Sequence, residues 1–232
     1  MRRIFIILFV LLFAGFANST TLTVQDHTRV MRFLLDHPTA LKNWLSSRGR
    51  AGSVSPDEVF NFISSLARTR SSRDMVQIIN RARNMSRRTR GVYPGGIYNN
   101  VIQRIRSARS LAELRNILSS EKSRISRIRT RNRMVINLSM GLEIAYQIIE
   151  DGMANGIYSP ESYSVFLGKR RTRSIWSAIK DQLLDTAKDD AVGAVVGVFV
   201  GPEGAIGGAI AASSASVAEV VLDLILNPEP AY

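Results

Sequence analysis

The sequence predicts an all-α fold, a multi-helix bundle that ends in a helical hairpin rich in glycine and alanine. Helix-start signals recur along the chain and precede stripes of apolar residues at helical spacing. No segment of comparable length alternates apolar and polar residues as a half-buried strand would. With 232 residues, 45% of them hydrophobic, the chain can bury one sizeable core or two small ones.

Residues 1–17 predict an export signal. Arg2 and Arg3 precede an apolar run from Ile4 to Phe13 that is too short to span a bilayer core of about 30 Å comfortably. Small residues follow, and we expect cleavage between Ala17 and Asn18. The alternative is a buried N-terminal helix. Export implies a secreted or periplasmic protein, for which anionic lipid is a better default partner than nucleic acid.

The middle of the chain is predicted to contain helices with defined starts. Ser55-Pro-Asp-Glu58 reads as a capping box with proline at the first helical position, and Ser110-Leu-Ala-Glu113 repeats the box. Arg73–Arg88 carries an apolar stripe between arginines. The heptad spacing predicts one long helix from about Glu121 to Asp151. Ser159-Pro-Glu161 is expected to begin another short helix. Loops are expected at Ser47–Ser53, Gly91–Gly96 and Gly152–Ser159.

Charge is unevenly distributed along the chain. Between Asn61 and Arg133, 17 Arg and one Lys face three acids, which gives a net charge of +15. From Ser174 to Tyr232, two Lys face eight acids, a net of −6. This asymmetry predicts an arginine-rich helical domain over residues 18–173 and an acidic hairpin over 174–232. Part of the basic surface could also face the acidic segment.

Two arginine clusters are candidate anion-binding sites. Arginine suits phosphate because its planar guanidinium donates two parallel hydrogen bonds. The alternative is a solvated helix face, and sparse aromatic residues nearby give little support to single-strand base stacking. On a continuous helix, the arginines of the second cluster would align. The candidate residues are Arg87, Arg88, Arg90, Arg124, Arg127 and Arg131.

The sequence offers little for catalysis or metal binding. There is no cysteine, and the two histidines, His27 and His37, lack the spacing of paired ligands on one helix face. A Ser-His-Asp site is not excluded by sequence, but no Gly-x-Ser-x-Gly elbow supports one. We therefore expect a non-enzymatic protein without a cofactor, a metal site or a small-molecule substrate.

The C-terminal segment predicts a helical hairpin with glycines on its inner face. Ser174 is expected to cap the first helix, and Gly201-Pro-Glu203-Gly204 to form the turn before a second helix that runs to about Leu226. Glycines at four-residue spacing, each costing about 1 kcal/mol of helix propensity relative to alanine, make sense where two backbones approach closely. The residues expected to pack, or to form a membrane hairpin, are Gly193, Gly197, Gly201, Glu203, Gly204, Gly208 and Ala212.

Residues 191–221 are similar in composition and spacing to two groups of membrane-active segments. They resemble the glycine-zipper tails of secreted membrane-active peptides, including unmodified bacteriocins, and the Gly/Ala-rich fusion segments of viral entry proteins. The resemblance implies packing, oligomerisation or insertion at a membrane. However, the charge-free arms, Ala191–Pro202 and Gly204–Ala218, are shorter than a bilayer core at 1.5 Å per residue. Insertion is therefore expected to be conditional.

Two functions fit these observations. In the first, an exported protein associates peripherally with anionic membranes through its arginines, and the hairpin inserts or oligomerises. In the second, the protein is a soluble interaction module whose hairpin is core and whose basic face binds an acidic protein or polyanion. A processed precursor cut near Arg173 is a third reading.

Overall fold

The computed structural model describes residues 21–48, 53–92, 95–128, 130–167 and 173–226. Over these residues the protein consists of ten α-helices and two short 3-10 helices, without a strand. The prediction of an all-α multi-helix bundle is confirmed. The predicted export signal and its cleavage position between Ala17 and Asn18 lie outside the described residues.

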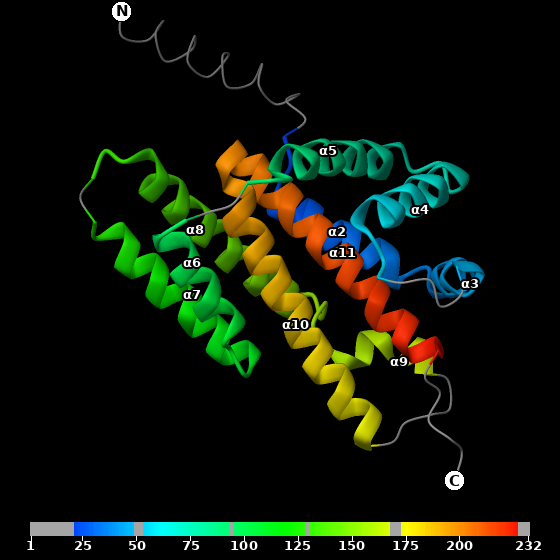
Figure 1. The fold of residues 1–232 in the computed structure, drawn as a ribbon. Helices are drawn as coiled ribbons and strands as arrows, with labels where there is room; N and C mark the ends of the chain where they lie inside the picture. The colour runs from blue at the N-terminus through cyan, green and yellow to red at the C-terminus, as the bar shows by residue number, and fades with distance from the viewer. Residues whose placement is uncertain (1–20, 49–52, 93–94, 129, 168–172, 227–232) are drawn as a thin grey trace, which may run out of the picture.

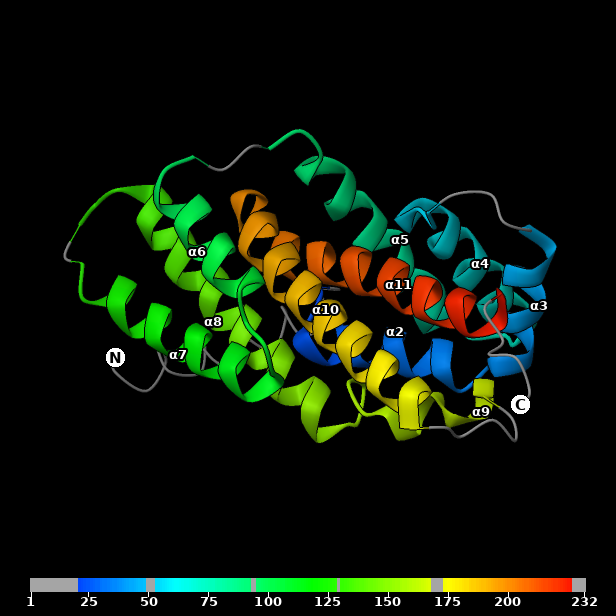
Figure 2. The same cartoon turned by 60° about the horizontal axis from the view of Figure 1, so that its bottom comes forward.

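The helices follow one another through short connections, and Figures 1 and 2 show them from two directions. The first five α-helices of the described chain are α2 (Val24–Leu35), α3 (Pro38–Arg48), α4 (Pro56–Thr69), α5 (Arg73–Thr89) and α6 (Ile97–Arg106). The remainder are α7 (Leu111–Ser126), α8 (Arg133–Ala154), η2 (Pro160–Tyr163), α9 (Ser164–Leu167), α10 (Arg173–Gly197), η3 (Val198–Val200) and α11 (Pro202–Leu226).

The helix caps follow the local sequence closely. Ser55 forms the predicted capping box with Glu58, and Pro56 occupies the first turn of α4. Ser110 caps α7 by accepting a hydrogen bond from the backbone of Glu113, but the Glu113 carboxylate accepts from the Arg109 backbone, so the box is incomplete. Each cap satisfies backbone groups that the helix itself leaves free.

The prediction of one long helix over Glu121–Asp151 is wrong. The chain leaves α7 after Ser126 and begins α8 at Arg133, and the two helices pack side by side (Figure 1). The Asn132 side chain accepts a hydrogen bond from the Met134 backbone and so starts a new helix. A continuous helix would have stacked like charges and left both apolar faces without a partner. We call the described residues of this connection, 127, 128 and 130–132, the elbow.

The hairpin of α10 and α11 lies in the middle of the bundle (Figure 2). Helix α11 packs against α10 along its length and also against α2, α3, α4, α5 and α8. Most of its first five turns are buried, including Ile210 and Val217, which are fully inaccessible. The arginine-rich helices and the acidic hairpin contribute to one hydrophobic core.

Candidate functional site

The two hairpin helices touch through their glycine backbones. A Cβ atom added to Gly193 would lie 2.6 Å from the Gly208 carbonyl oxygen and 2.8 Å from its carbon. A Cβ on Gly197 would lie 2.6 Å from the carbonyl carbon of Gly204. No real Cβ sits so close to backbone atoms, so only glycine allows this approach. The structure therefore brings together four of the residues predicted to pack.

The other predicted hairpin residues have different places. Gly201 forms the turn with φ +99°, and a Cβ there would meet nothing within 4 Å, so it serves backbone conformation rather than helix packing. Its assignment to the packing face is corrected. Glu203 lies half-buried in the first turn of α11. Ala212 is half-buried further along α11.

Towards the open end of the hairpin, polar pairs replace the glycines. Thr186 and Ser216 share a hydrogen bond of 2.8 Å, and Gln182 donates to Asp223 at 2.9 Å. The outer side of α11 also packs closely against a surrounding helix. A Cβ on Gly207 would lie 2.6 Å from the Cβ of Met85, in α5. The hairpin is thus joined within itself by backbone and polar contacts and to its surroundings by apolar ones.

A buried polar cluster connects the hairpin to α2. His27 Nε2 lies 3.0 Å from the Ser213 hydroxyl and 3.2 Å from a carboxylate oxygen of Asp190, and all three side chains are fully buried. Tyr158 donates to the other Asp190 oxygen at 2.6 Å. Burial, and after it the charge of Asp190, raises the pKa of Tyr158 well above its usual value, so its hydroxyl remains a donor. Sequence spacing gave no sign of this cluster.

The cluster has the residue types of a nucleophilic triad without its geometry. In a triad the serine and the carboxylate bind opposite nitrogens of the imidazole. Here both approach Nε2, Nδ1 has no partner among the described residues, and the Ser213 hydroxyl donates to the Ala209 carbonyl. The arrangement favours a structural role that fixes α2 against the hairpin. His37, apart from it, hydrogen-bonds the Phe33 carbonyl at 2.8 Å.

The first arginine cluster is partly engaged within the protein. Arg90 donates to Asp57 at 2.7 Å and Arg87 lies 3.7 Å from the same carboxyl group, which ties the end of α5 to the start of α4. The hydrogen bond from Arg90 is the largest cause that lowers the pKa of Asp57. Arg88 is exposed and has no ion-pair partner among the described residues. The three arginines therefore do not form one free anion site.

The second cluster divides in the same way. Arg124 binds Glu121 through two nitrogens, at 2.9 and 2.6 Å, and Arg104 of α6 pairs with the other oxygen of that fully buried carboxylate. Because the helix ends at Ser126, the expected alignment of Arg124, Arg127 and Arg131 on one helix is corrected. Arg127 and Arg131 lie instead on the elbow, exposed and without an ion-pair partner in the described part of the chain.

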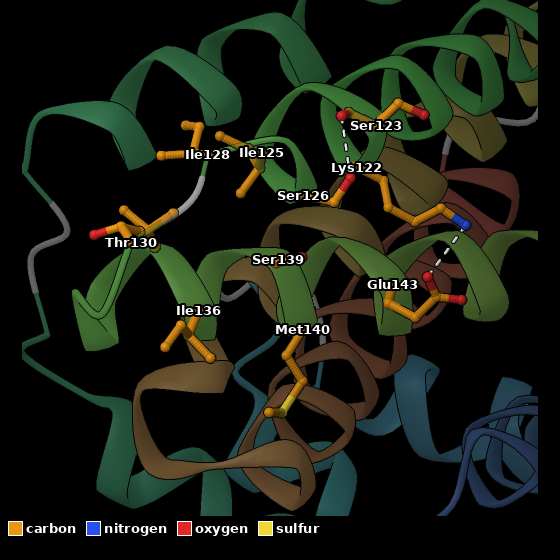
Figure 3. A pocket seen from close by; sticks show the side chains of 11 residues that line it. Lys122, Ser123, Ile125, Ser126, Ile128, Thr130, Ile136, Ser139, Met140 and Glu143 are labelled. Atoms are coloured by element: carbon orange, nitrogen blue, oxygen red, sulfur yellow. Dashed lines mark hydrogen bonds and ion pairs between the residues drawn. The ribbon is translucent and has the colours of Figure 1, made fainter.

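An open groove lies between α7 and α8 beside the elbow (Figure 3). Ile125 and Ile128 line it from α7 and the elbow, and Ile136 and Met140 line it from α8. An ion pair of 3.1 Å between Lys122 and Glu143 crosses the two helices at one end. Four of the six large apolar side chains that are exposed in the described residues belong to this region: Ile128, Met134, Ile136 and Met140, at 36–48% exposure.

The elbow lies at the same end of the bundle as the hairpin turn. The ring of Tyr98, in α6, packs 4.6 Å from the ring of Phe199 just before the turn, and its hydroxyl donates to the Met134 carbonyl at 2.8 Å. About two turns further along α8, a Cβ on Gly141 would lie 3.2 Å from the Val198 Cβ. These contacts join the groove to the hairpin tip, and sequence periodicity did not reveal them.

By length and composition, α11 is the one helix of the described residues that could cross a membrane, a test that the core helix of a soluble protein also passes. No protein-family model, curated protein or solved structure matches the chain.

Proposed function

We propose that the protein is an exported, non-enzymatic helical protein that associates with anionic membranes through its arginine-bearing surface. Its C-terminal hairpin is the core of the water-soluble form and is released to insert or oligomerise at the bilayer as a glycine zipper. The observation that carries the proposal is the burial of most of α11, the charge-poor arm of the hairpin, among helices that bear arginines.

The length of the hairpin helices is compatible with insertion. Each of α10 and α11 has 25 residues, which at 1.5 Å per residue extends about 37 Å, against a bilayer core of about 30 Å. Insertion would bring Glu203 through the membrane at a cost of about 3 kcal/mol on insertion scales. Five charged side chains between Asp181 and Asp190 also oppose it. A hairpin of this composition is stable in the protein core and needs an event at the membrane to leave it.

The packing contacts support release of the hairpin as one unit. Its two helices are joined by glycine backbone contacts, which do not depend on water and would persist in lipid. The contacts with Met85, Tyr98 and other surrounding side chains are apolar and can be exchanged for lipid contacts. The His27–Asp190 contact and its neighbours must break, so the cluster opposes release.

Vesicle flotation tests the association. The chain from Asn18 onward is mixed with neutral or anionic vesicles and floated before and after a high-salt wash. We expect binding to anionic vesicles, part of which resists salt because apolar contact is not screened. Absence of binding to both kinds of vesicle would contradict the proposal.

A disulfide tether tests the release of the hairpin. Because the chain has no cysteine, Gly141→Cys with Val198→Cys introduces a unique pair. The two Cβ atoms would be 3.2 Å apart, against about 3.5–4.5 Å in disulfides, so a small shift closes the bond. We expect the oxidised pair to lose salt-resistant binding and the reduced pair, like each single cysteine variant, to keep it. Equal salt resistance in both redox states would refute release.

The burial of the hairpin also supports the second function. If the hairpin never leaves the core, the protein is a soluble interaction module whose unpaired arginines bind an acidic protein or polyanion. Binding that salt reverses completely, and that the tether leaves unchanged, would favour this function over the first.

A further inference from the structure

We infer that the elbow, with the groove behind it, is the surface that docks on an anionic bilayer and that it brings the hairpin tip to the membrane. The inference rests on the proposed function, because it says where on the molecule that association occurs. It does not depend on insertion of the hairpin.

The apolar part of this surface is concentrated in a small region. Ile128 on the elbow and Ile136 and Met140 on α8 border the same groove and are 40%, 48% and 36% exposed. Scattered single apolar side chains are normal on a protein surface, but a group around one groove marks a site of contact. Ile136 and Met140 stand one helical turn apart, so both can enter the headgroup region together.

The charged part of this surface consists of arginines that neighbour these apolar side chains in sequence. Arg127, Arg131 and Arg133 are exposed and have no ion-pair partner among the described residues. Elsewhere, Arg87, Arg90 and Arg104 are paired with carboxylates of the protein itself. The elbow therefore combines free guanidinium groups with exposed apolar side chains, which is the combination that a lipid surface with phosphate headgroups binds.

Charge complementarity favours a bilayer as the occupant. The groove is open and lined by apolar and small polar side chains, and its acidic residue Glu143 is already paired with Lys122. The exposed arginines of the elbow adjoin this lining along the chain, so the charge beside the groove is positive. Arginine side chains can hold headgroup phosphates while their aliphatic stems lie along the apolar layer.

Docking at the elbow would place the hairpin tip next to the membrane. Tyr98 links the two directly, since it packs on Phe199 and donates to the Met134 carbonyl. Burial raises the pKa of Tyr98 to about 12, so this hydroxyl donates throughout the physiological range. A displacement of Met134 on lipid binding would therefore act on the tip of the hairpin.

Paired variants test the inference by flotation with vesicles of phosphatidylcholine and phosphatidylglycerol. Ile136→Ser with Met140→Ser removes apolar surface at the groove, and Met153→Ser with Val165→Ser removes it elsewhere, at 40% and 56% exposure. We expect the first pair to lower the partition coefficient about tenfold and the second to leave it within about twofold. Circular dichroism and urea unfolding confirm that each variant is folded.

A charge pair makes the same comparison. Arg127→Gln with Arg131→Gln should lower binding about thirtyfold, which is the conversion of about 1 kcal/mol for each arginine at an anionic surface. Arg68→Gln with Arg70→Gln, two exposed arginines at the C-terminal end of α4 without an ion-pair partner among the described residues, changes the net charge equally and should weaken binding far less.

The outcomes separate the two proposals. If the unaltered chain binds neither vesicle, the proposed function fails and the docking surface fails with it. If the unaltered chain binds but either elbow pair binds as well as its control pair, the inference is wrong and the proposed function stands.

A fluorescent probe placed in the groove reports docking directly. An environment-sensitive dye on Ile136→Cys should shift to shorter wavelength with anionic vesicles, while the same dye on Val165→Cys should not. A shift at Val165→Cys alone would overturn the inference.

Discussion

Replacement of Gly193 by alanine tests the hairpin contact most directly. Helix propensity alone would raise the free energy of unfolding, whereas steric overlap with α11 would lower it, so the sign of the change shows which effect dominates. In the interior of a helix, glycine to alanine stabilises by about 1 kcal/mol. In this structure the new Cβ would lie 2.6 Å from the Gly208 oxygen, 2.8 Å from its carbon and 3.0 Å from the Ala209 nitrogen. All three are backbone atoms, so no side chain can rotate out of the way.

The magnitude follows from the shift that the helices must make. Contacts of a real Cβ are rarely shorter than 3.4 Å, so α10 and α11 must separate by several tenths of an ångström at this point. Overpacking of a close-packed core costs about 1–3 kcal/mol, and here rigid backbone puts the cost near the upper end. After the gain in helix propensity, we expect Gly193→Ala to lower the free energy of unfolding by about 1–2 kcal/mol.

Urea unfolding followed by circular dichroism measures this change. Ala178→Gly, at an exposed interior position of α10, calibrates the propensity effect in the same protein and should cost about 1 kcal/mol. Gly95→Ala, where a Cβ meets nothing within 4 Å, should leave stability almost unchanged. If Gly193→Ala raised the free energy of unfolding, the close backbone contact between α10 and α11 would be refuted.

Three further variants test other parts of the structure. Glu121→Gln removes the buried carboxylate charge that pairs with Arg104 and Arg124. It should lower the free energy of unfolding by about 2 kcal/mol in the same assay. No loss of stability would show that these ion pairs contribute nothing. Gly201→Ala places a side chain at φ +99° in open space, so a cost of about 1–2 kcal/mol would be purely conformational, and a neutral result would argue against this turn. For Asp189, desolvation and then the charges of Asp190 and Asp185 raise the pKa from 3.8 to about 6, so the folded state binds the proton more tightly and stability falls as pH rises from about 4 to 6. Because the Asp189 side chain is exposed, solvent screens these charges and weakens the effect. Asp189→Asn should flatten the fall in urea midpoints measured from pH 4 to 8, and identical pH profiles would contradict this.

The local features of this protein could be predicted from sequence because each depends on a few neighbouring residues. The cap at Ser55 requires a serine, a glutamate three residues later and an apolar run. The hairpin follows from Gly201-Pro202 between two apolar segments, and the four-residue spacing of glycines puts them on one helix face.

Tertiary structure alone decided which of these residues meet and which remain free. His27, Asp190 and Ser213 come from three helices, and neither periodicity nor spacing could bring them together. The break at the elbow occurs because α8 folds back onto α7. Burial of the apolar faces of both helices stabilises the fold more than continuation of a single long helix would.

The arginines show the same division most clearly. Sequence determines that they are numerous and clustered, because charge is a property of each residue. Whether a guanidinium group is free depends on which carboxylates the fold brings near it. Asp57 pairs with Arg90 and Glu121 pairs with Arg124. Arg127 and Arg131 remain exposed. Composition therefore determined the charge and the hairpin, and packing determined which arginines are free to bind and that most of α11 is buried in the core.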